Sequence, residues 1–192
     1  QRVLLVDTDP QGNVTSQMTD FTADEPPQLT LADVLDRQSQ APVTDVVIPS
    51  RRAGIDVLPS GFDGLQAVQD VLFGKPGAES SLSRALGPVV DKWDHIFVDT
   101  RPATDLITRN AFMAADELVL ILEPEVPAIR GADQTMRAIA ELEEYLGKYL
   151  PVAGWVINRV NNTRKDHEEY VQRIRELTID DEVAILGDPI PL

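Results

Sequence analysis

The sequence predicts an α/β fold: a doubly wound, mostly parallel sheet with helices on both faces. Three observations carry that prediction. Short apolar runs of strand length recur along the chain, and several are apolar throughout, which is typical of strands buried on both faces of a parallel sheet. Helical stretches lie between these runs, so strands and helices alternate. Polar residues directly follow several runs, at the strand ends where such sheets bind ligands.

The expected elements follow in chain order. The strands are residues 3–6 (VLLV), 55–58 (IDVL), 95–98 (HIFV), 118–122 (LVLIL), 152–157 (VAGWVI) and 183–186 (VAIL). Residues 20–54 are rich in proline and polar residues, which predicts a loop region around a short helix near Leu31–Arg37. Helices are expected over residues 62–73, 79–92, 130–148 and 166–177. The last two place apolar residues on one side, namely Ala132, Met136, Ile139, Ala140 and Leu146, and Tyr170, Ile174 and Leu177.

The length and composition bound the class of protein. A chain of 192 residues with 43% hydrophobic residues fits one domain over residues 1–192 with a sizeable core. No apolar run approaches the ~20 residues needed to cross a bilayer, and the start does not have the pattern of a signal peptide. The sequence has no cysteine, which excludes disulfides and thiolate metal sites and suits a cytoplasmic protein.

The charge is strongly acidic. The 32 Asp and Glu residues outnumber the 17 Lys and Arg residues, and the net charge is −15. Only Lys75, Lys92, Lys148 and Lys165 are lysines. This acidic, lysine-poor composition indicates a halophilic source, with an acidic mesophile protein as the alternative. The charge argues against a broad polyanion-binding face at low salt.

The stretch VLLVDTDPQGN, residues 3–13, carries the most specific chemical signal. An apolar strand ends on Asp7 and Asp9, and Pro10 and Gly12 then break the chain. One of the two carboxylates could serve a Mg²⁺ shell, and the other could orient or deprotonate an attacking water. The run HIFVDT ends on Asp99 and has the form of a Walker B element. A single strand-end acid is most often a cap or turn, but several together indicate a site.

The motifs resemble a known family in their order along the chain. RVLLVDTDPQGNVTS resembles the switch I segment of the ParA/MinD (Soj-like) family of deviant Walker A partition ATPases. DHIFVDTRPATDLITRNAFMAADELVLILEPE resembles their Walker B and switch II region, and LTLADVL with GIDVLPSG resembles the segment between. VINRVNN resembles the N-R motif that reads adenine, and LGDPIPL resembles the final strand and its I-P turn. The resemblance covers essentially the whole chain and implies a P-loop NTPase-like fold.

The resemblance also implies roles for individual residues. Asp9 matches the residue that activates the hydrolytic water. Asp7 matches the acid near the Mg²⁺ shell, and Asp99 matches the Walker B carboxylate. Asn158 matches the adenine contact, with Arg159 beside it, and Pro191 lines the base. The alternative for Asn158 and Arg159 is a polar strand end that caps the next helix.

Two departures from the family pattern stand out. Arg101 occupies a switch II position where the family usually has proline, and it could alter the γ-phosphate sensor or supply a surface cation. No stretch matches G-x-x-x-x-G-K-[ST], the loop whose backbone N–H groups and lysine cradle phosphates. In the family this loop precedes, by about one helix, the strand that residues 3–6 match. We therefore expect a sequence trimmed at both ends, with the P-loop before Gln1.

The implied function is that of an ATP-dependent partition ATPase with weak intrinsic activity. Such a protein binds Mg²⁺ and ATP, forms a homodimer on ATP binding, binds DNA non-specifically, and is stimulated by a ParB-like partner during plasmid or chromosome segregation. A basic cluster could contact DNA, but acidic residues between positions 166 and 182 interrupt it and favour a solvated helix face. The cluster is Arg159, Arg164, Lys165, Arg173 and Arg175. No C-terminal amphipathic helix for membrane binding is visible.

Three alternatives remain at this point. One is a ParA-like interaction module that has lost hydrolysis, and another is an ATPase that positions cargo or the division site. The third is a phosphoacceptor receiver domain, which also has an acidic pair and a later strand-end acid. Asp99 lies about twice as far along the chain as that later acid would, and no Lys-Pro follows a later strand, so the receiver domain is disfavoured.

Overall fold

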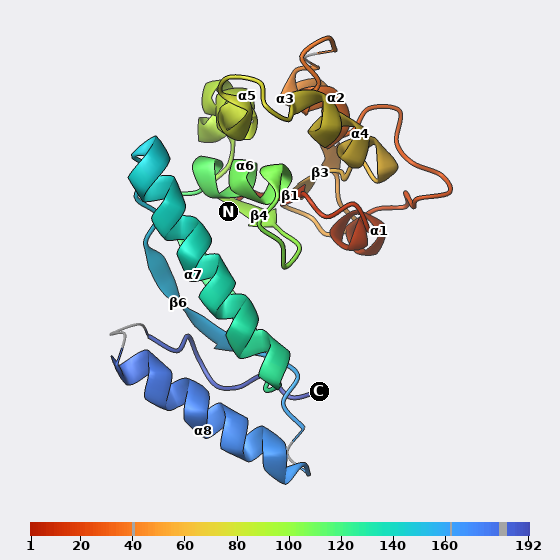
Figure 1. Ribbon diagram of the computed structural model, residues 1–192. Helices are drawn as coiled ribbons and strands as arrows, with labels where there is room; N and C mark the ends of the chain where they lie inside the picture. The colour runs from red at the N-terminus through yellow and green to blue at the C-terminus, as the bar shows by residue number, and fades with distance from the viewer. Residues whose placement is uncertain (40, 162, 181–183) are drawn as a thin grey trace. The chain divides into compact units, whose positions relative to one another are not determined.

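The computed structural model describes residues 1–39, 41–161, 163–180 and 184–192, without the side chains of residues 126–130, 165 and 177–180. The chain forms two compact units, Gln1–Ala114 and Ala115–Leu192, and each is described by itself (Figure 1). The single domain expected over residues 1–192 stays a prediction. Parallel strands alternate with helices in both units, so the predicted α/β class with a mostly parallel sheet is confirmed.

The first unit contains a four-stranded sheet in the order β2-β3-β1-β4. Strand β1 (Val3–Asp7) lies between β3 (Ile55–Leu58) and β4 (His95–Asp99), and it is parallel to both. The register pairs Asp7 with Asp99, so the two strands end at the same level. The short edge strand β2 (Ile48–Pro49) runs antiparallel to β3.

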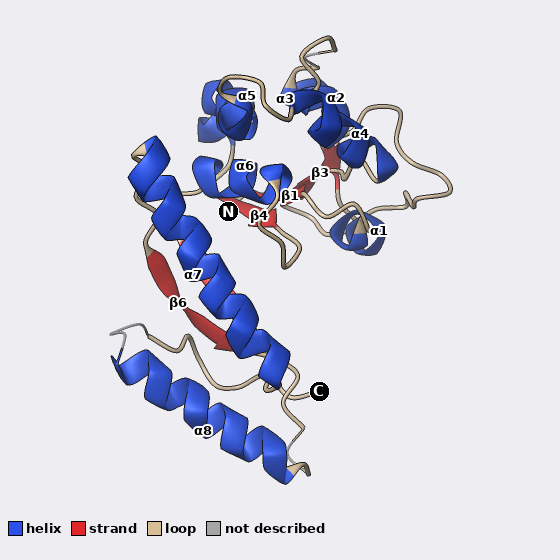
Figure 2. Ribbon diagram, viewed as in Figure 1, coloured by secondary structure: helices blue, strands red, loops and turns tan. Residues whose placement is uncertain are grey.

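Most helices of the first unit cover one face of this sheet. The alternation along β1 buries Leu4 and Val6 completely, and they join one apolar core with Leu58, Leu65 and Leu82. The helices are α1 (Asn13–Met18), α2 (Leu31–Leu35), α3 (Val43–Val46), α4 (Asp63–Leu72), α5 (Ser81–Leu86) and α6 (Leu106–Ala114). Figure 2 shows how short most of them are beside the loops that join them. The core therefore holds the strand ends in a fixed register.

Two of the expected elements in this unit are wrong in detail. The helix expected over residues 79–92 is only α5, flanked by 3₁₀ turns at Ala78–Ser80 and Gly87–Lys92. Pro88 has no N–H to donate and favours a helix start, so one continuous helix does not form there. The expected loop region 20–54 also contains α3 and β2, whose apolar residues are too few for a periodic signal.

The second unit pairs strand β5 (Leu118–Leu122) in parallel with β6 (Val152–Ile157). Helices α7 (Val126–Leu146) and α8 (Lys165–Asp180) accompany them. The core includes Leu122, Trp155 and Ile157 from the strands and Ile174 from α8. The strand expected over residues 183–186 begins outside the described residues, and its described part makes an isolated parallel bridge between Ile185 and Trp155.

The helices of the second unit are longer than expected, because α7 begins before residue 130 and α8 extends past residue 177. Ala132 and Ile139 are buried as predicted, whereas Met136, Ala140 and Leu146 are exposed. Within the described residues, none of the helices combines the length and apolar character needed to span a membrane.

Candidate functional site

Three predicted carboxylates meet at the carboxyl edge of the first unit's sheet. Asp7 ends β1 and is paired in register with Asp99 at the end of β4, while Asp9 follows two residues later. Thr8 ties the two strand ends together, since its N–H and Oγ1 both donate to the Asp99 carbonyl, at 3.0 and 2.6 Å. The site is therefore built on two adjacent parallel strands.

Asp7 is fully buried, and both of its carboxylate oxygens accept hydrogen bonds. The Thr15 N–H donates to Oδ2 at 2.8 Å and the Thr15 hydroxyl donates to the same oxygen at 2.7 Å. The Asp9 N–H donates to Oδ1 at 3.2 Å. Asp7 thus anchors α1 and holds the backbone of Asp9 in place. Burial raises the pKa of Asp7 above 3.8, and the hydrogen bonds from Thr15 oppose that shift.

Two polar residues that sequence reasoning missed complete this network. The Ser60 N–H donates to Thr15 Oγ1 at 2.9 Å, and the Ser60 hydroxyl donates to the Asp9 carbonyl at 2.6 Å. Thr15 and Ser60 are both completely buried. The segment after β3 therefore supports the Asp9 loop from a distant part of the chain. Both residues lie in stretches that resemble the family, RVLLVDTDPQGNVTS and GIDVLPSG, but nothing in either stretch indicates that the two side chains meet.

Gly12 allows the loop after Asp9 to turn into α1. Its φ is +63°, and a Cβ at this position would lie 2.1 Å from the Phe62 ring, which is too close for any side chain. The Gly12 N–H donates to the Asp9 carbonyl at 2.9 Å. The glycine of DTDPQGN is thus required by local geometry.

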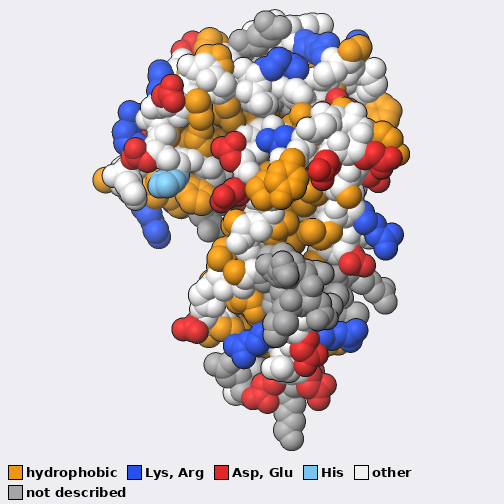
Figure 3. All heavy atoms as spheres, turned by 90° about the vertical axis from the view of Figure 1, so that its left-hand side faces the viewer, with side chains coloured by type: hydrophobic (Ala, Val, Ile, Leu, Met, Phe, Trp, Pro, Cys, Tyr) orange, Lys and Arg blue, Asp and Glu red, His pale blue; other side chains and the backbone are white. Residues whose placement is uncertain are grey.

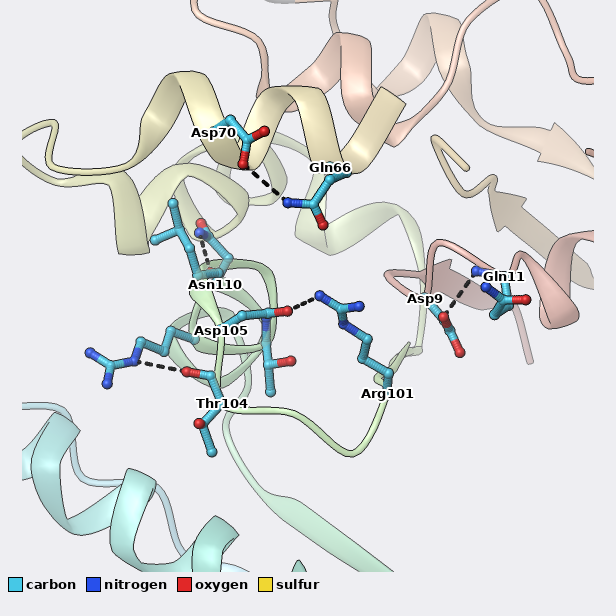
Figure 4. A network of polar contacts seen from close by, with 11 residues as sticks. Asp9, Gln11, Gln66, Asp70, Arg101, Thr104, Asp105 and Asn110 are labelled. Carbon is cyan, nitrogen blue, oxygen red and sulfur yellow. Dashed lines mark hydrogen bonds and ion pairs between the residues drawn. The ribbon is translucent and has the colours of Figure 1, made fainter. Parts of the chain in front are cut away.

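Asp9 is half-buried and keeps one carboxylate oxygen available. The Gln11 N–H donates to Oδ1 at 2.9 Å, as Figure 4 shows. Oδ2 accepts no hydrogen bond from the described residues. A carboxylate that is oriented through one oxygen can accept a proton or a hydrogen bond from water through the other.

Asp99 has the most open carboxylate of the three. Its side chain reaches solvent, and it accepts no hydrogen bond from the described residues. Partial burial raises the pKa of Asp99 above 3.8, and the negative charges of Asp7 and Asp9 raise it further. Three acids with mutual repulsion favour a cation at this edge.

The edge fits a magnesium ion that keeps most of its waters. Among the described residues, no group of three or more His, Asp or Glu side chains forms a ready-made metal cage. Mg²⁺ is usually held by only one or two carboxylates, together with water and phosphate oxygens. Asp99, with no competing hydrogen bond, meets that requirement.

The remaining predicted residues gather at the end of β6 in the second unit. The Asn158 N–H donates to the Leu122 carbonyl at 2.8 Å, and Arg159 has a φ of +58° and pairs with Glu123 at 3.1 Å. Val160 makes a parallel bridge with Pro191, and its N–H donates to the Ile190 carbonyl at 2.9 Å. The structure thus brings Asn158, Arg159 and Pro191 together within this unit.

The Asn158 side chain has capacity to bind a ligand. It is half-buried, and its amide makes no hydrogen bond to the described residues. In the next loop, Asn161 Oδ1 accepts from the Thr163 N–H at 3.0 Å and the Asn161 N–H donates to His167 Nδ1 at 3.0 Å, so these contacts do not involve the Asn158 side chain. The Asn158 amide therefore remains free to present a donor and an acceptor.

Replacing Asp7 with alanine is expected to lower the free energy of unfolding by about 1–3 kcal/mol, because the buried Thr15 and Asp9 N–H groups would lose their acceptor. Urea unfolding measures the loss. Asp7→Asn keeps one acceptor for Thr15 and should cost less, and Asp24→Ala, in an exposed loop, is the control. A stability equal to that of the parent would show that this network does not hold α1.

Comparison with known proteins gives a consistent result. The sequence pattern of the AAA domain family matches residues 1–152. An uncharacterized protein of Mycobacterium tuberculosis is 30% identical over 99% of this chain and 63% of its own length. The sporulation initiation inhibitor protein Soj of Bacillus subtilis is 30% identical over 84% of this chain and 62% of its own length. The chromosome partitioning protein ParA of Caulobacter vibrioides is also 30% identical, over 91% and 64%.

Solved structures share the fold. Cobyrinic acid a,c-diamide synthase from Mycobacterium smegmatis, solved with a bound ATP analogue and magnesium, has a TM-score of 0.85 and 25% identity, over all of this chain and 75% of its own. Apo McdA from Cyanothece has a TM-score of 0.82 at 23% identity, over 97% of this chain and 73% of its own, and this likeness concerns the fold alone. The chain spans about 63% of the length of the curated relatives it matches.

Proposed function

Since this chain belongs to the AAA domain family, among relatives of the ParA/MinD type, we propose that it binds Mg·ATP and hydrolyses it as a partition ATPase. The observation that carries the proposal is the carboxylate edge of the first unit. It places an open Asp99 and an oriented Asp9 on adjacent strand ends. In the second unit, Asn158 and Arg159 lie at the end of β6, where Val160 bridges with Pro191, and this group is the proposed contact for the base.

The three acids would divide the work according to their surroundings. Asp99, with an open carboxylate, would hold the cation directly or through water. Asp9 would orient or deprotonate the attacking water through its available oxygen, while Gln11 fixes the other. Asp7, proposed near the Mg²⁺ shell, would act by holding the Asp9 backbone and α1, because its own oxygens are already engaged. When bound, ATP would supply the phosphoanhydride bond, and Mg²⁺ would supply positive charge that offsets the negative charge of the transferred phosphoryl group.

The direct test is hydrolysis by the complete protein encoded by the gene. Phosphate release from ATP that requires Mg²⁺ supports the proposal. Binding of Mg·ATP without turnover would favour the alternative of a non-hydrolysing interaction module, and no binding at all would overturn both. The single turnover rate is expected to be slow without a partner.

Replacing Asn158 with alanine should weaken ATP binding by about 1–3 kcal/mol, since a side-chain amide that pairs with the base would be lost. Equilibrium binding of ATP, GTP and inorganic phosphate measures the effect. The affinity for ATP should fall most and the affinity for inorganic phosphate least. Equal losses for all three ligands would assign Asn158 to the structure of the strand end.

The roles in assembly are part of the same proposal. We expect a homodimer on ATP binding, stimulation by a ParB-like partner, and non-specific DNA binding in plasmid or chromosome segregation; positioning of a cargo or division site is the alternative. The surface of the predicted basic cluster gives DNA little to bind, because Arg159 pairs with Glu123 and Arg164 pairs with Asp166. The Lys165 side chain lies outside the described residues.

The surface shown in Figure 3 also offers DNA little to bind. On the face shown in Figure 3, the basic side chains of described residues are scattered among acidic ones. On α8, Arg173 shares its exposed side with Glu168, Glu169 and Glu176. Phosphate groups bind where cations gather, so the described side chains of α8 favour a solvated helix face over a DNA contact.

A further inference from the structure

Arg101 turns inward from the loop between β4 and α6. Its guanidinium forms an ion pair with Asp105, four residues along the chain. The second oxygen of Asp105 accepts from the Thr108 N–H at 3.0 Å and so caps the start of α6. Figure 4 shows the Arg101 side chain directed toward Asp105. One carboxylate therefore joins the loop to the helix.

The pair differs from an ordinary surface ion pair in its burial. The Arg101 side chain is 32% exposed and that of Asp105 is 19% exposed. The Nε–H of Arg101 is buried and has no hydrogen-bond partner in the described part of the chain. An arginine that served only as a surface cation would keep its donors in water, where they cost nothing. In the arrangement that pairs Arg101 with Asp105, the Arg101 Nε–H is buried without a hydrogen-bond partner in the described part of the chain.

The helix that receives the pair is firmly held. The Asn110 side chain in α6 accepts from the Leu82 N–H at 3.0 Å and donates to the Ala78 carbonyl at 2.9 Å. Ile107 and Phe112 are buried on the same helix. At the other end of the loop, Thr8 fixes the Asp99 carbonyl. Arg101 thus ties the start of a short loop, two residues beyond Asp99, to a rigid element.

We propose that Arg101 is a positioning residue: its pair with Asp105 holds the segment after Asp99 in one arrangement, so that the carboxylates at the strand ends keep a fixed geometry toward their reactants. This inference rests on the proposed ATPase function.

The test compares Arg101→Met, Asp105→Asn and the double variant in the complete protein, with Arg101→Lys as the conservative change. Asp105→Asn keeps an oxygen for Thr108, so it removes the pair and spares the cap. Turnover of Mg·ATP should fall roughly tenfold in both single variants, as loss of positioning does, with the ATP dissociation constant unchanged. The double variant should be no slower than either single one, and Arg101→Lys should keep most of the rate.

Several results would overturn the proposal. An Arg101→Met variant that turns over Mg·ATP at the parent rate would do so. Losses of turnover that add up in the double variant would do so as well. A loss of ATP affinity in Arg101→Met that Asp105→Asn does not share would show that Arg101 contacts nucleotide itself.

Hydrogen exchange over residues 100–108 without nucleotide separates this proposal from the proposed function. If the parent hydrolyses no ATP, the proposed function fails, and faster exchange in Arg101→Met still supports the hold on the loop. Unchanged exchange overturns it.

Discussion

Asp9→Ala in the complete protein is expected to lower ATP hydrolysis by about 10²–10⁴-fold, the usual loss when a general base is removed. The site places Asp9 with one oxygen fixed by Gln11 and one available to water. Phosphoryl transfer to water depends on a positioned nucleophile. Mg·ATP binding and ATP-dependent dimerisation should persist, because the backbone bonds that hold the loop come from Asp7 and Ser60.

Single-turnover hydrolysis and equilibrium binding, measured on the same preparation, separate the two effects. Asp9→Asn keeps the size and the bond from Gln11 and should be almost as slow as the alanine variant, since it cannot accept the proton. Asp24→Ala, a change of equal charge in an exposed loop, should hydrolyse at the parent rate. If Asp9→Ala hydrolyses normally, or loses binding together with hydrolysis, Asp9 does not activate the water.

Asp99→Ala is expected to weaken Mg·ATP binding and to slow hydrolysis together, because a metal-holding carboxylate would be lost. The loss should be several kcal/mol, which is more than about 100-fold in the rate of hydrolysis. Its open carboxylate is the one best placed to receive a cation. Titration of Mg²⁺ at fixed ATP should show the affinity for the metal falling with the rate. A variant that binds Mg·ATP as the parent does would remove Asp99 from the metal site.

Removing the Asp99 charge has the opposite effect on the stability of the protein without nucleotide. The pKa of Asp99 is raised in the folded state, so between 3.8 and that raised pKa the folded chain binds more protons than the unfolded chain. Stability therefore falls as pH rises through this window, and the full cost is present at neutral pH. Asp99→Asn should raise the melting temperature at pH 7, and the difference from the parent should vanish as pH falls below 3.8. An unchanged melting temperature at pH 7 would show that the acids do not repel appreciably.

The sequence by itself predicted strands β1, β3, β4, β5 and β6 and the acids that end β1 and β4, but not the short strand β2. Apolar runs of strand length and the breaking residues Pro10 and Gly12 are local features, which can be read without knowledge of contacts to the rest of the chain. The ordered series of motifs identified the family, which the matches to the AAA domain, Soj and ParA confirm. Since parallel strands end at one edge, the meeting of Asp7 with Asp99 followed from the fold class.

Only the tertiary structure decided what each carboxylate touches. Thr15 and Ser60 lie 45 positions apart and meet because the core sets β1 and β3 in register. That contact, with the burial around it, separates an engaged Asp7 from an available Asp9 and an open Asp99. The inward turn of Arg101 likewise depends on a fixed α6. Such contacts depend on packing between distant segments, and no periodicity or motif in a single sequence records the packing.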